Sequence, residues 1–158
     1  MRDKLIFAFT CLLILMIPST IASNSVVELE VEESLSDSDL GILAGALSPN
    51  GESVLIVGLD GYAREISALQ AGDRTKDVEL NTARTVSLND VSWHPRGQAA
   101  LIAGDAGVAL RYETSNHGVT LVNGTGEIIG RDLSTVEWRQ AGDYAYFGAE
   151  DGGVWKFA

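Results

Sequence analysis

Residues that commonly build covalent or catalytic sites are scarce in this chain. Its 158 residues include one cysteine, Cys11, and two histidines. One cysteine excludes an internal disulfide framework, and without C-x-x-C or H-E-x-x-H patterns the sequence offers no zinc site. The G-x-S-x-G motif of serine hydrolases is also missing. We therefore predict no catalytic residue, no metal and no cofactor.

Basic residues are also few, and two of them stand at the N-terminus. Arg2 and Lys4 precede a 13-residue apolar run, which is followed by small residues. This order is typical of a secretory signal peptide over residues 1–23, cleaved after Ala22 or Ser23. A membrane anchor is the alternative, but a span needs about 20 apolar residues. The sequence predicts a secreted or extracytoplasmic protein.

Removing this segment makes the chain more acidic. The 11 basic and 22 acidic residues become 9 and 21 without Arg2, Asp3 and Lys4, so the net charge changes from −11 to −12. Such a charge disfavours binding to nucleic acid or anionic membranes and favours solubility. We expect a protein partner, no nucleic acid, and no membrane span in the mature chain.

A block of 22 residues occurs three times without gaps. Its copies are ALSPNGESVLIVGLDGYAREIS at 46–67, SWHPRGQAALIAGDAGVALRYE at 92–113 and EWRQAGDYAYFGAEDGGVWKFA at 137–158. The aligned columns include Gly51 with Gly97 and Gly142, Gly61 with Gly107 and Gly152, and Leu47 with Trp93 and Trp138. A period of this length indicates an array of one supersecondary unit.

The pattern inside each block predicts strands. Short apolar runs at 53–57, 99–103 and 143–147 are bounded by turn-forming residues, which is typical of buried strands. The first glycine column marks a hairpin turn before each run, and the second marks a tight turn after it. A further strand follows at 62–69, 108–114 and 154–157.

Each block thus holds three strands joined by two turns. The rest of each period has room for a fourth strand. The candidates are 84–88 and either 119–122 or 127–129. Four antiparallel strands in about 45 residues form one blade of a β-propeller. We predict an all-β fold of about three four-stranded blades over residues 40–158.

The second copy carries a recognisable pattern. The pattern consists of Trp93, Pro95, Gly97, Leu101, Ile102, Gly104 and Gly107. It resembles WD40-type and related YVTN-like β-propeller repeats. The resemblance covers about residues 40–158 and implies a propeller that binds other proteins. The Gly-His and Trp-Asp dipeptides of WD40 repeats are missing, and Gln140 replaces the proline in the third copy.

Two features lie outside the repeats. Residues 24–39 contain six acidic side chains and no basic one. They are expected to form a solvated leader or edge strand, with an acidic arm for a cation or a basic partner as the alternative. Asn123 begins an Asn-Gly-Thr sequon and is a glycosylation candidate because the chain looks exported.

The number of repeats raises a further question. Closed propellers typically have 4 to 8 blades, whereas three repeats are visible here. The leading explanation is that the chain is the N-terminal part of a longer propeller. A homo-oligomer that closes the ring is the alternative.

Acidic loop residues are the main candidates for function. Loops from equivalent turns gather on one face of a propeller, and the predicted binding residues are Asp60, Asn89, Asp90, Asp105, Asp132, Glu150 and Asp151. They could bind a cation, a basic peptide or a sugar, although Asp is also common in turns for its own backbone hydrogen bonds. His94 and His117 are expected to be solvated turn residues.

Two classes of function follow. The first is an exported, noncatalytic propeller that serves as a binding or assembly platform. The alternative is a propeller hydrolase or lyase for polysaccharides, in which two axial carboxylates act as acid and base about 5 to 10 Å apart. A fold alone does not decide between them.

Overall fold

The computed structural model describes residues 41–68, 74–122 and 126–158. The predicted signal segment, the acidic segment 24–39 and the sequon residue Asn123 lie outside these described residues. Within the described ranges, no helix is long and apolar enough to cross a membrane.

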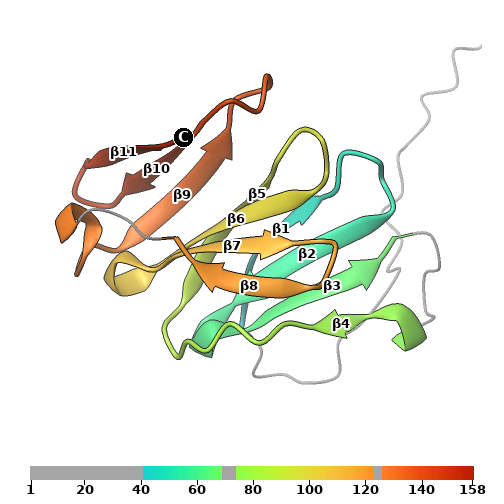
Figure 1. The fold of residues 1–158 in the computed structure, drawn as a ribbon. Coiled ribbons are helices and arrows are strands. Elements are labelled where there is room, and N and C mark those ends of the chain that lie inside the picture. Colours follow the sequence, from blue (N-terminus) through green and yellow to red (C-terminus); the bar gives the residue numbers. More distant parts are fainter. Residues whose placement is uncertain (1–40, 69–73, 123–125) are drawn as a thin grey trace, which may run out of the picture. The chain divides into compact units, whose positions relative to one another are not determined.

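The described chain folds into three antiparallel sheets, and each repeat contributes one sheet (Figure 1). The first sheet contains β1 (Ile42–Leu47), β2 (Ser53–Gly58), β3 (Ala63–Ser67) and β4 (Val78–Glu79). The second contains β5 (Leu88–Trp93), β6 (Ala99–Gly104), β7 (Ala109–Glu113) and β8 (Gly118–Leu121). The third contains β9 (Leu133–Trp138), β10 (Ala145–Ala149) and β11 (Val154–Phe157).

Consecutive strands are neighbours in every sheet, and the described regions contain no α-helix. Short 3-10 turns connect some strands: η1 (Leu59–Gly61), η2 (Arg74–Lys76), η3 (Asp105–Gly107) and η4 (Gly126–Ile128). The predicted all-β class with propeller-like blades is confirmed. The described part of the third sheet has three strands, and the three sheets together form an open array rather than a closed ring.

The fourth strands differ in part from the prediction. In the first sheet this strand is β4, at Val78–Glu79, and not 84–88. Residues 84–88 are used differently, because Arg84 passes over the η1 turn while Leu88 starts the next sheet. In the second sheet β8 matches the predicted 119–122, and 127–129 instead overlaps the η4 turn.

The first glycine column has the role that its sequence predicts. The amide of Gly51 donates to the Ser48 carbonyl at 2.8 Å, and Gly97 and Gly142 repeat this bond at 2.7 and 2.8 Å. All three glycines have φ between +72° and +73°, a conformation that glycine adopts without a Cβ clash. Each hairpin therefore turns in the same way and sets the same register.

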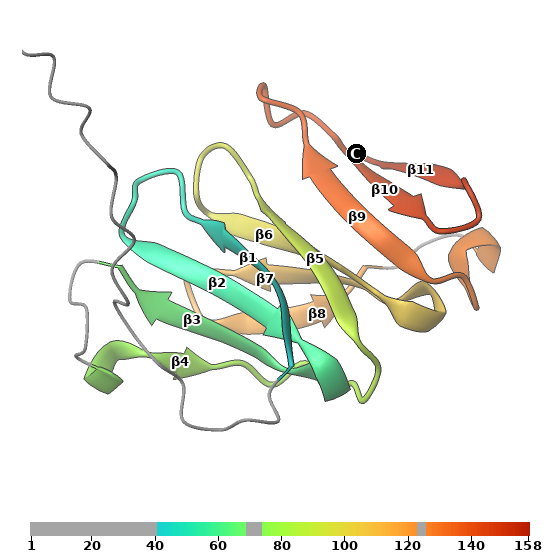
Figure 2. The same ribbon diagram turned by 180° about the vertical axis from the view of Figure 1, so that it is seen from behind.

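The hydrophobic core consists of two layers, each between neighbouring sheets. The first layer joins the first and second sheets through residues such as Leu55, Trp93 and Tyr112. The second joins the second and third sheets through residues such as Leu101 and Phe147. Figures 1 and 2 show the second sheet between the other two. Each blade thus needs a neighbour to bury its apolar face, as repeat proteins do.

The three sheets contact one another mainly through their first strands, β1, β5 and β9. Strand β5 has extensive contacts with both β1 and β9. Each of these strands also contains an irregularity at the same place in the repeat. The register shifts at Ile42/Ala44, at Leu88/Asp90 and opposite Gly148/Ala149. A bulge of this kind bends a strand and redirects its side chains. It lies at the end of the sheet where the predicted site residues are found.

Candidate functional site

The predicted site residues come from one end of the sheets, which we call the loop face. It consists of the turns after β2, β6 and β10 and the connections that lead into β5 and β9. The hairpins at Gly51, Gly97 and Gly142 lie at the opposite end, because antiparallel strands reverse direction at each turn. The predicted gathering of these loops at one end is thus consistent with the strand order.

The turns after β2 and β6 have a tight left-handed geometry. Asp60 and Ala106 have φ values of +53° and +56°, and the glycine after each has φ of +75° or +77°. The amides of Tyr62 and Val108 close the turns at 2.9 and 3.1 Å. Positive φ at both central residues is the type I′ turn, whose twist matches that of two antiparallel strands.

The glycines of these turns also leave room for the connection that follows. A Cβ on Gly61 would lie 2.1 Å from the Arg84 carbonyl oxygen, and one on Gly107 would lie 2.0 Å from that of Ile128. The buried Thr82 hydroxyl donates to the Gly61 carbonyl at 2.7 Å. The connection therefore packs tightly on the turn in both sheets.

The turn after β10 is different. The Gly152 amide donates to the Ala149 carbonyl at 3.0 Å, and among its residues only Gly152 has positive φ, at +87°. Asp151, the counterpart of Asp60 and Ala106, therefore has an ordinary backbone conformation. Its carboxylate pairs with Arg131, whose guanidinium also lies 5.7 Å from the centre of the Trp155 ring.

Asp105, Asn89 and Asp132 link the second and third sheets. The Asn89 amide donates to the Asp105 carboxylate at 2.7 Å and to the Leu133 carbonyl at 2.9 Å. Asp132 accepts a bond of 2.9 Å from the Ala106 amide. These side chains therefore fix the loops of two neighbouring sheets to each other.

Asp90 makes a further connection between the second and third sheets. Its carboxylate accepts from the Val136 amide at 2.8 Å, from the Thr135 hydroxyl at 2.9 Å and from the Val91 amide at 2.9 Å. Two of these donors belong to β9 of the next sheet. Hydrogen bonds to a charged group are stronger than neutral ones, so Asp90 holds β5 and β9 together.

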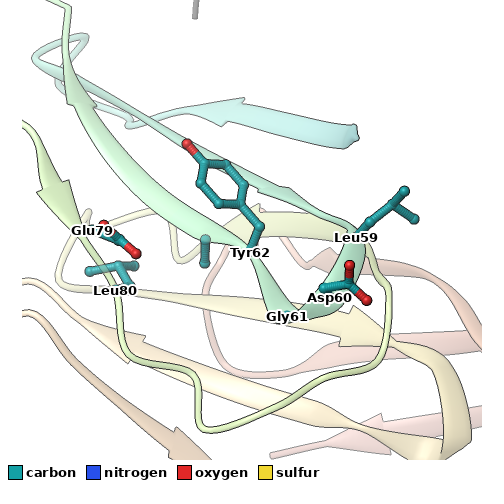
Figure 3. A pocket seen from close by; sticks show the side chains of 7 residues that line it. Leu59, Asp60, Gly61, Tyr62, Glu79 and Leu80 are labelled. Atoms are coloured by element: carbon teal, nitrogen blue, oxygen red, sulfur yellow. The ribbon is translucent and has the colours of Figure 1, made fainter. Parts of the chain in front are cut away.

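Asp60 and Glu150 have more open surroundings. Asp60 is exposed, and among the described residues nothing bonds its carboxylate; Glu150 is exposed, and its backbone amide donates to the Asp132 carbonyl at 3.1 Å. Asp60 lines a cavity of about 290 Å³ with Leu59, Gly61, Tyr62, Ala63, Glu79 and Leu80. Figure 3 shows Asp60 and Glu79 on opposite sides of Tyr62.

One polar cluster was not foreseen in the sequence. The Tyr112 hydroxyl donates to the Glu65 carboxylate, and His117 Nδ1 lies 2.9 Å from that hydroxyl and 3.0 Å from Glu65 Oε2. Burial of Tyr112, together with the hydrogen bond and negative charge of Glu65, raises the pKa of its phenol well above the ordinary value. The cluster joins β3 to β7, and each residue alone looks unremarkable in the sequence.

The sequence predicts that both histidines are solvated turn residues. In the structure, each of them instead makes hydrogen bonds. His117 is half-exposed but bonded to the first sheet. His94 Nδ1 accepts from the Arg96 amide at 3.1 Å, so its proton lies on Nε2, which donates to the Gly142 carbonyl at 3.0 Å. Its ring also packs edge-on against Trp138, with 4.7 Å between ring centres.

No three His, Cys, Asp or Glu side chains in the described part of the chain lie close enough together to hold a metal ion. The loop-face carboxylates are instead spread over three sheets. Asp90 and Asp132 are hydrogen-bond acceptors between the second and third sheets, whereas Asp105 accepts from Asn89 within the second sheet. Their chemistry here is to position loops and to give the face negative charge.

Comparison with known proteins supports the fold but does not identify a family. The sequence matches no protein-family model and none of the curated proteins with which it was compared. Among solved structures, it is similar to Kuenenia stuttgartiensis hydrazine synthase, with a TM-score of 0.58 and 15% identity. The match covers 76% of this chain and 32% of that chain. The chain thus spans about a third of its structural neighbour, and the likeness concerns the fold alone.

Proposed function

We propose that this chain is an exported, noncatalytic β-propeller-type repeat protein that serves as a binding platform for a protein partner. The loop face is the proposed binding surface. Its main support is that Asp90, Asp105 and Asp132 are held by donors in neighbouring loops and strands. A surface fixed in this way loses little conformational entropy when it binds.

The charge of the chain favours a basic partner. The chain without its predicted signal segment carries 21 acidic and 9 basic residues. Asp60 and Glu79 flank the loop-face cavity, and among the described residues nothing bonds their carboxylates. A negative face attracts a positive partner over long range and orients it before contact. Export is supported by the order of basic, apolar and small residues at positions 1–23.

A titration with a ten-residue lysine peptide tests the proposed face. Asp60→Asn and Glu79→Gln each remove one carboxylate of the cavity, and each should weaken binding about 2- to 5-fold, the effect of one exposed ion pair. Asp143→Asn is the matched control, because it removes an exposed charge from the opposite end of the sheets. Equal losses in all three variants would mean that the peptide senses only net charge.

Asp60→Asn, together with Asp105→Asn, tests the noncatalytic part of the proposal. The purified chain is incubated with soluble acidic and neutral polysaccharides, and new reducing ends are measured. We expect no turnover. Cleavage by the natural chain that disappears in Asp60→Asn or Asp105→Asn would favour the hydrolase or lyase alternative instead.

A further inference from the structure

Among the described residues, the outer face of the third sheet has the pattern of a blade interface but is not covered by another sheet. Leu55 in β2 and Leu101 in β6 are both 0% exposed, because each packs against the next sheet. Tyr146 stands at the same place of the repeat in β10 and is 46% exposed. The face of each blade that looks toward the following blade is therefore covered twice and open once.

Strand β11 shows the same relationship. Ala63 and Ala109 are each 1% exposed, whereas their counterpart Val154 is 66% exposed. Gly148 pairs with Val154 across the two strands, and Tyr146 pairs with Lys156. These four side-chain positions share one face, because alternate residues of a strand point to the same side. The opposite side carries Phe147, which packs against the second sheet.

The first sheet exposes the complementary surface. Leu88 and Trp93 of β5 pack on the first sheet and are 0% and 7% exposed. Their counterparts in β1 are Ile42 and Leu47, which are 48% and 59% exposed. Leu47 pairs with Val54, on the side of the first sheet opposite to Leu55. The first and third sheets thus present the two halves of one repeating interface.

We propose that these two faces bind each other between two copies of this chain, with the third sheet of one copy against the first sheet of its partner. The contact continues the interfaces that already join the first to the second sheet and the second to the third. Its core consists of Tyr146 and Val154 from one copy and Ile42 and Leu47 from the other. This inference goes beyond the proposed function, since it does not involve the loop face.

Two such contacts would close a ring of two copies. The described parts of two copies together contain six sheets, within the range of 4 to 8 blades in closed propellers. Each contact joins different surfaces, and heterologous contacts of this kind either close into a ring or continue as a filament. A ring of two copies covers the outer faces of the first and third sheets at once, so we expect a dimer of this chain rather than a filament.

Sedimentation velocity of the purified, exported chain tests the proposal. We expect a concentration-dependent dimer in the micromolar range. Val154→Glu places a carboxylate in the third-sheet face, and Leu47→Glu places one in the first-sheet face. Each should weaken the dimer by about tenfold or more, because an unpaired charge is costly to bury. Leu121→Glu is the control, since Leu121 is exposed on the outer strand β8.

A mixture of the two variants distinguishes the proposed contact from other pairings. Each variant retains one intact face, so Val154→Glu chains and Leu47→Glu chains should form mixed dimers through the single undamaged contact. A pairing of two third sheets would instead be lost in Val154→Glu, unaffected in Leu47→Glu and not restored in the mixture. That result, or a monomeric natural chain across the same concentrations, would overturn the proposal.

Circular dichroism and thermal unfolding verify that the variants are folded. The substituted side chains are exposed in a single copy, so unfolding temperatures close to that of the natural chain are expected at concentrations where the natural chain is monomeric. If either variant fails to fold, Tyr146→Glu and Ile42→Glu alter the same two faces at other positions. Mixed dimers of Tyr146→Glu and Ile42→Glu chains would likewise support the contact between the third sheet of one copy and the first sheet of the other.

Discussion

The indole nitrogen of Trp93 donates a hydrogen bond of 2.9 Å to the carbonyl of Ala46, across the layer between the second and first sheets. The ring also packs edge-on against Tyr112, with 5.8 Å between centres. Trp138 repeats this edge-on contact with Phe157 at 5.7 Å, but its buried Nε1 has no hydrogen-bond partner among the residues that the structure describes. Two equivalent tryptophans therefore differ in one bond.

This difference makes Trp93→Phe and Trp138→Phe a matched pair. Trp93→Phe leaves the Ala46 carbonyl without its donor, and we expect a loss of about 1 to 2 kcal/mol beyond the packing effect. Trp138→Phe removes a donor that already has no partner, so only the packing effect remains. Urea unfolding measures both free energies. Equal losses would show that the Trp93 bond contributes nothing to stability.

Asp90→Asn tests the connection between β5 and β9. The substitution removes the charge of an acceptor that binds the Val136 amide and the Thr135 hydroxyl. We expect a loss of about 1.5 to 3 kcal/mol, since hydrogen bonds to charged groups have this magnitude. Asp143→Asn removes an exposed carboxylate paired with Arg139 and should cost less than about 1 kcal/mol. Urea unfolding of both variants gives the comparison, and similar losses would contradict the assigned role of Asp90.

Ala106→Gly should stabilise the protein. Ala106 has φ of +56°, in the left-handed region, where a residue with a Cβ is strained by about 1 to 2 kcal/mol. Glycine removes this strain but gives the unfolded chain more freedom, so the expected net gain is about 0.5 to 1 kcal/mol. Thermal unfolding detects a gain of this size.

Ala141→Gly is the control for this prediction. Ala141 is an exposed turn residue outside the left-handed region. Glycine there relieves no strain, so its extra freedom in the unfolded state should lower the stability by up to about 1 kcal/mol. Changes of the same sign in Ala106→Gly and Ala141→Gly would contradict the assignment of strain to Ala106.

The buried phenol of Tyr112 predicts a loss of stability at alkaline pH. Its pKa is raised in the folded state by burial and by Glu65, so the unfolded chain loses this proton at lower pH than the folded chain does. The stabilisation is complete below a pH of about 10, the ordinary tyrosine pKa, and decreases above it. Each further pH unit should cost up to about 1.4 kcal/mol.

Tyr112→Phe tests this slope. The variant should lose stability at neutral pH, because Glu65 loses a donor, but its stability should fall less steeply between pH 10 and pH 12. Urea unfolding at several pH values gives both quantities. Tyr144→Phe, which changes a half-buried tyrosine outside this cluster, serves as the control for removing a tyrosine hydroxyl elsewhere in the chain. An unchanged slope in Tyr112→Phe would contradict the prediction.

The mature N-terminus is the last prediction. We expect exported protein to begin at Ser23 or Asn24, because the basic start, apolar run and small residues at 1–23 are typical of a cleaved signal. Terminal sequencing of secreted material identifies the first residue. Exported protein that still begins at Met1 would instead support the membrane-anchor alternative.

Much of the fold could be predicted because its signals are local. Gly51, Gly97 and Gly142 identify the hairpin turns, since the positive φ of each is favoured by glycine itself. The alternation of apolar residues between the turns specifies which strands pair. The short strand β4 could not be placed in this way. With two residues it has no periodicity, and its position depends on how the following connection packs over Gly61.

Less of the candidate site than of the fold could be predicted from the sequence. The sequence identified carboxylates such as Asp90 and Asp105 in the loops, because aspartate in a turn is a visible local pattern. Whether each carboxylate faces solvent or bonds to the next blade is decided by the donors that neighbouring sheets bring to it, such as Val136 for Asp90. The contact between Glu65 and His117 joins residues 52 positions apart. The sequence by itself determined the repeating blades, because turn and strand preferences act over a few residues, whereas only the stacking of those blades decided the polar contacts between them.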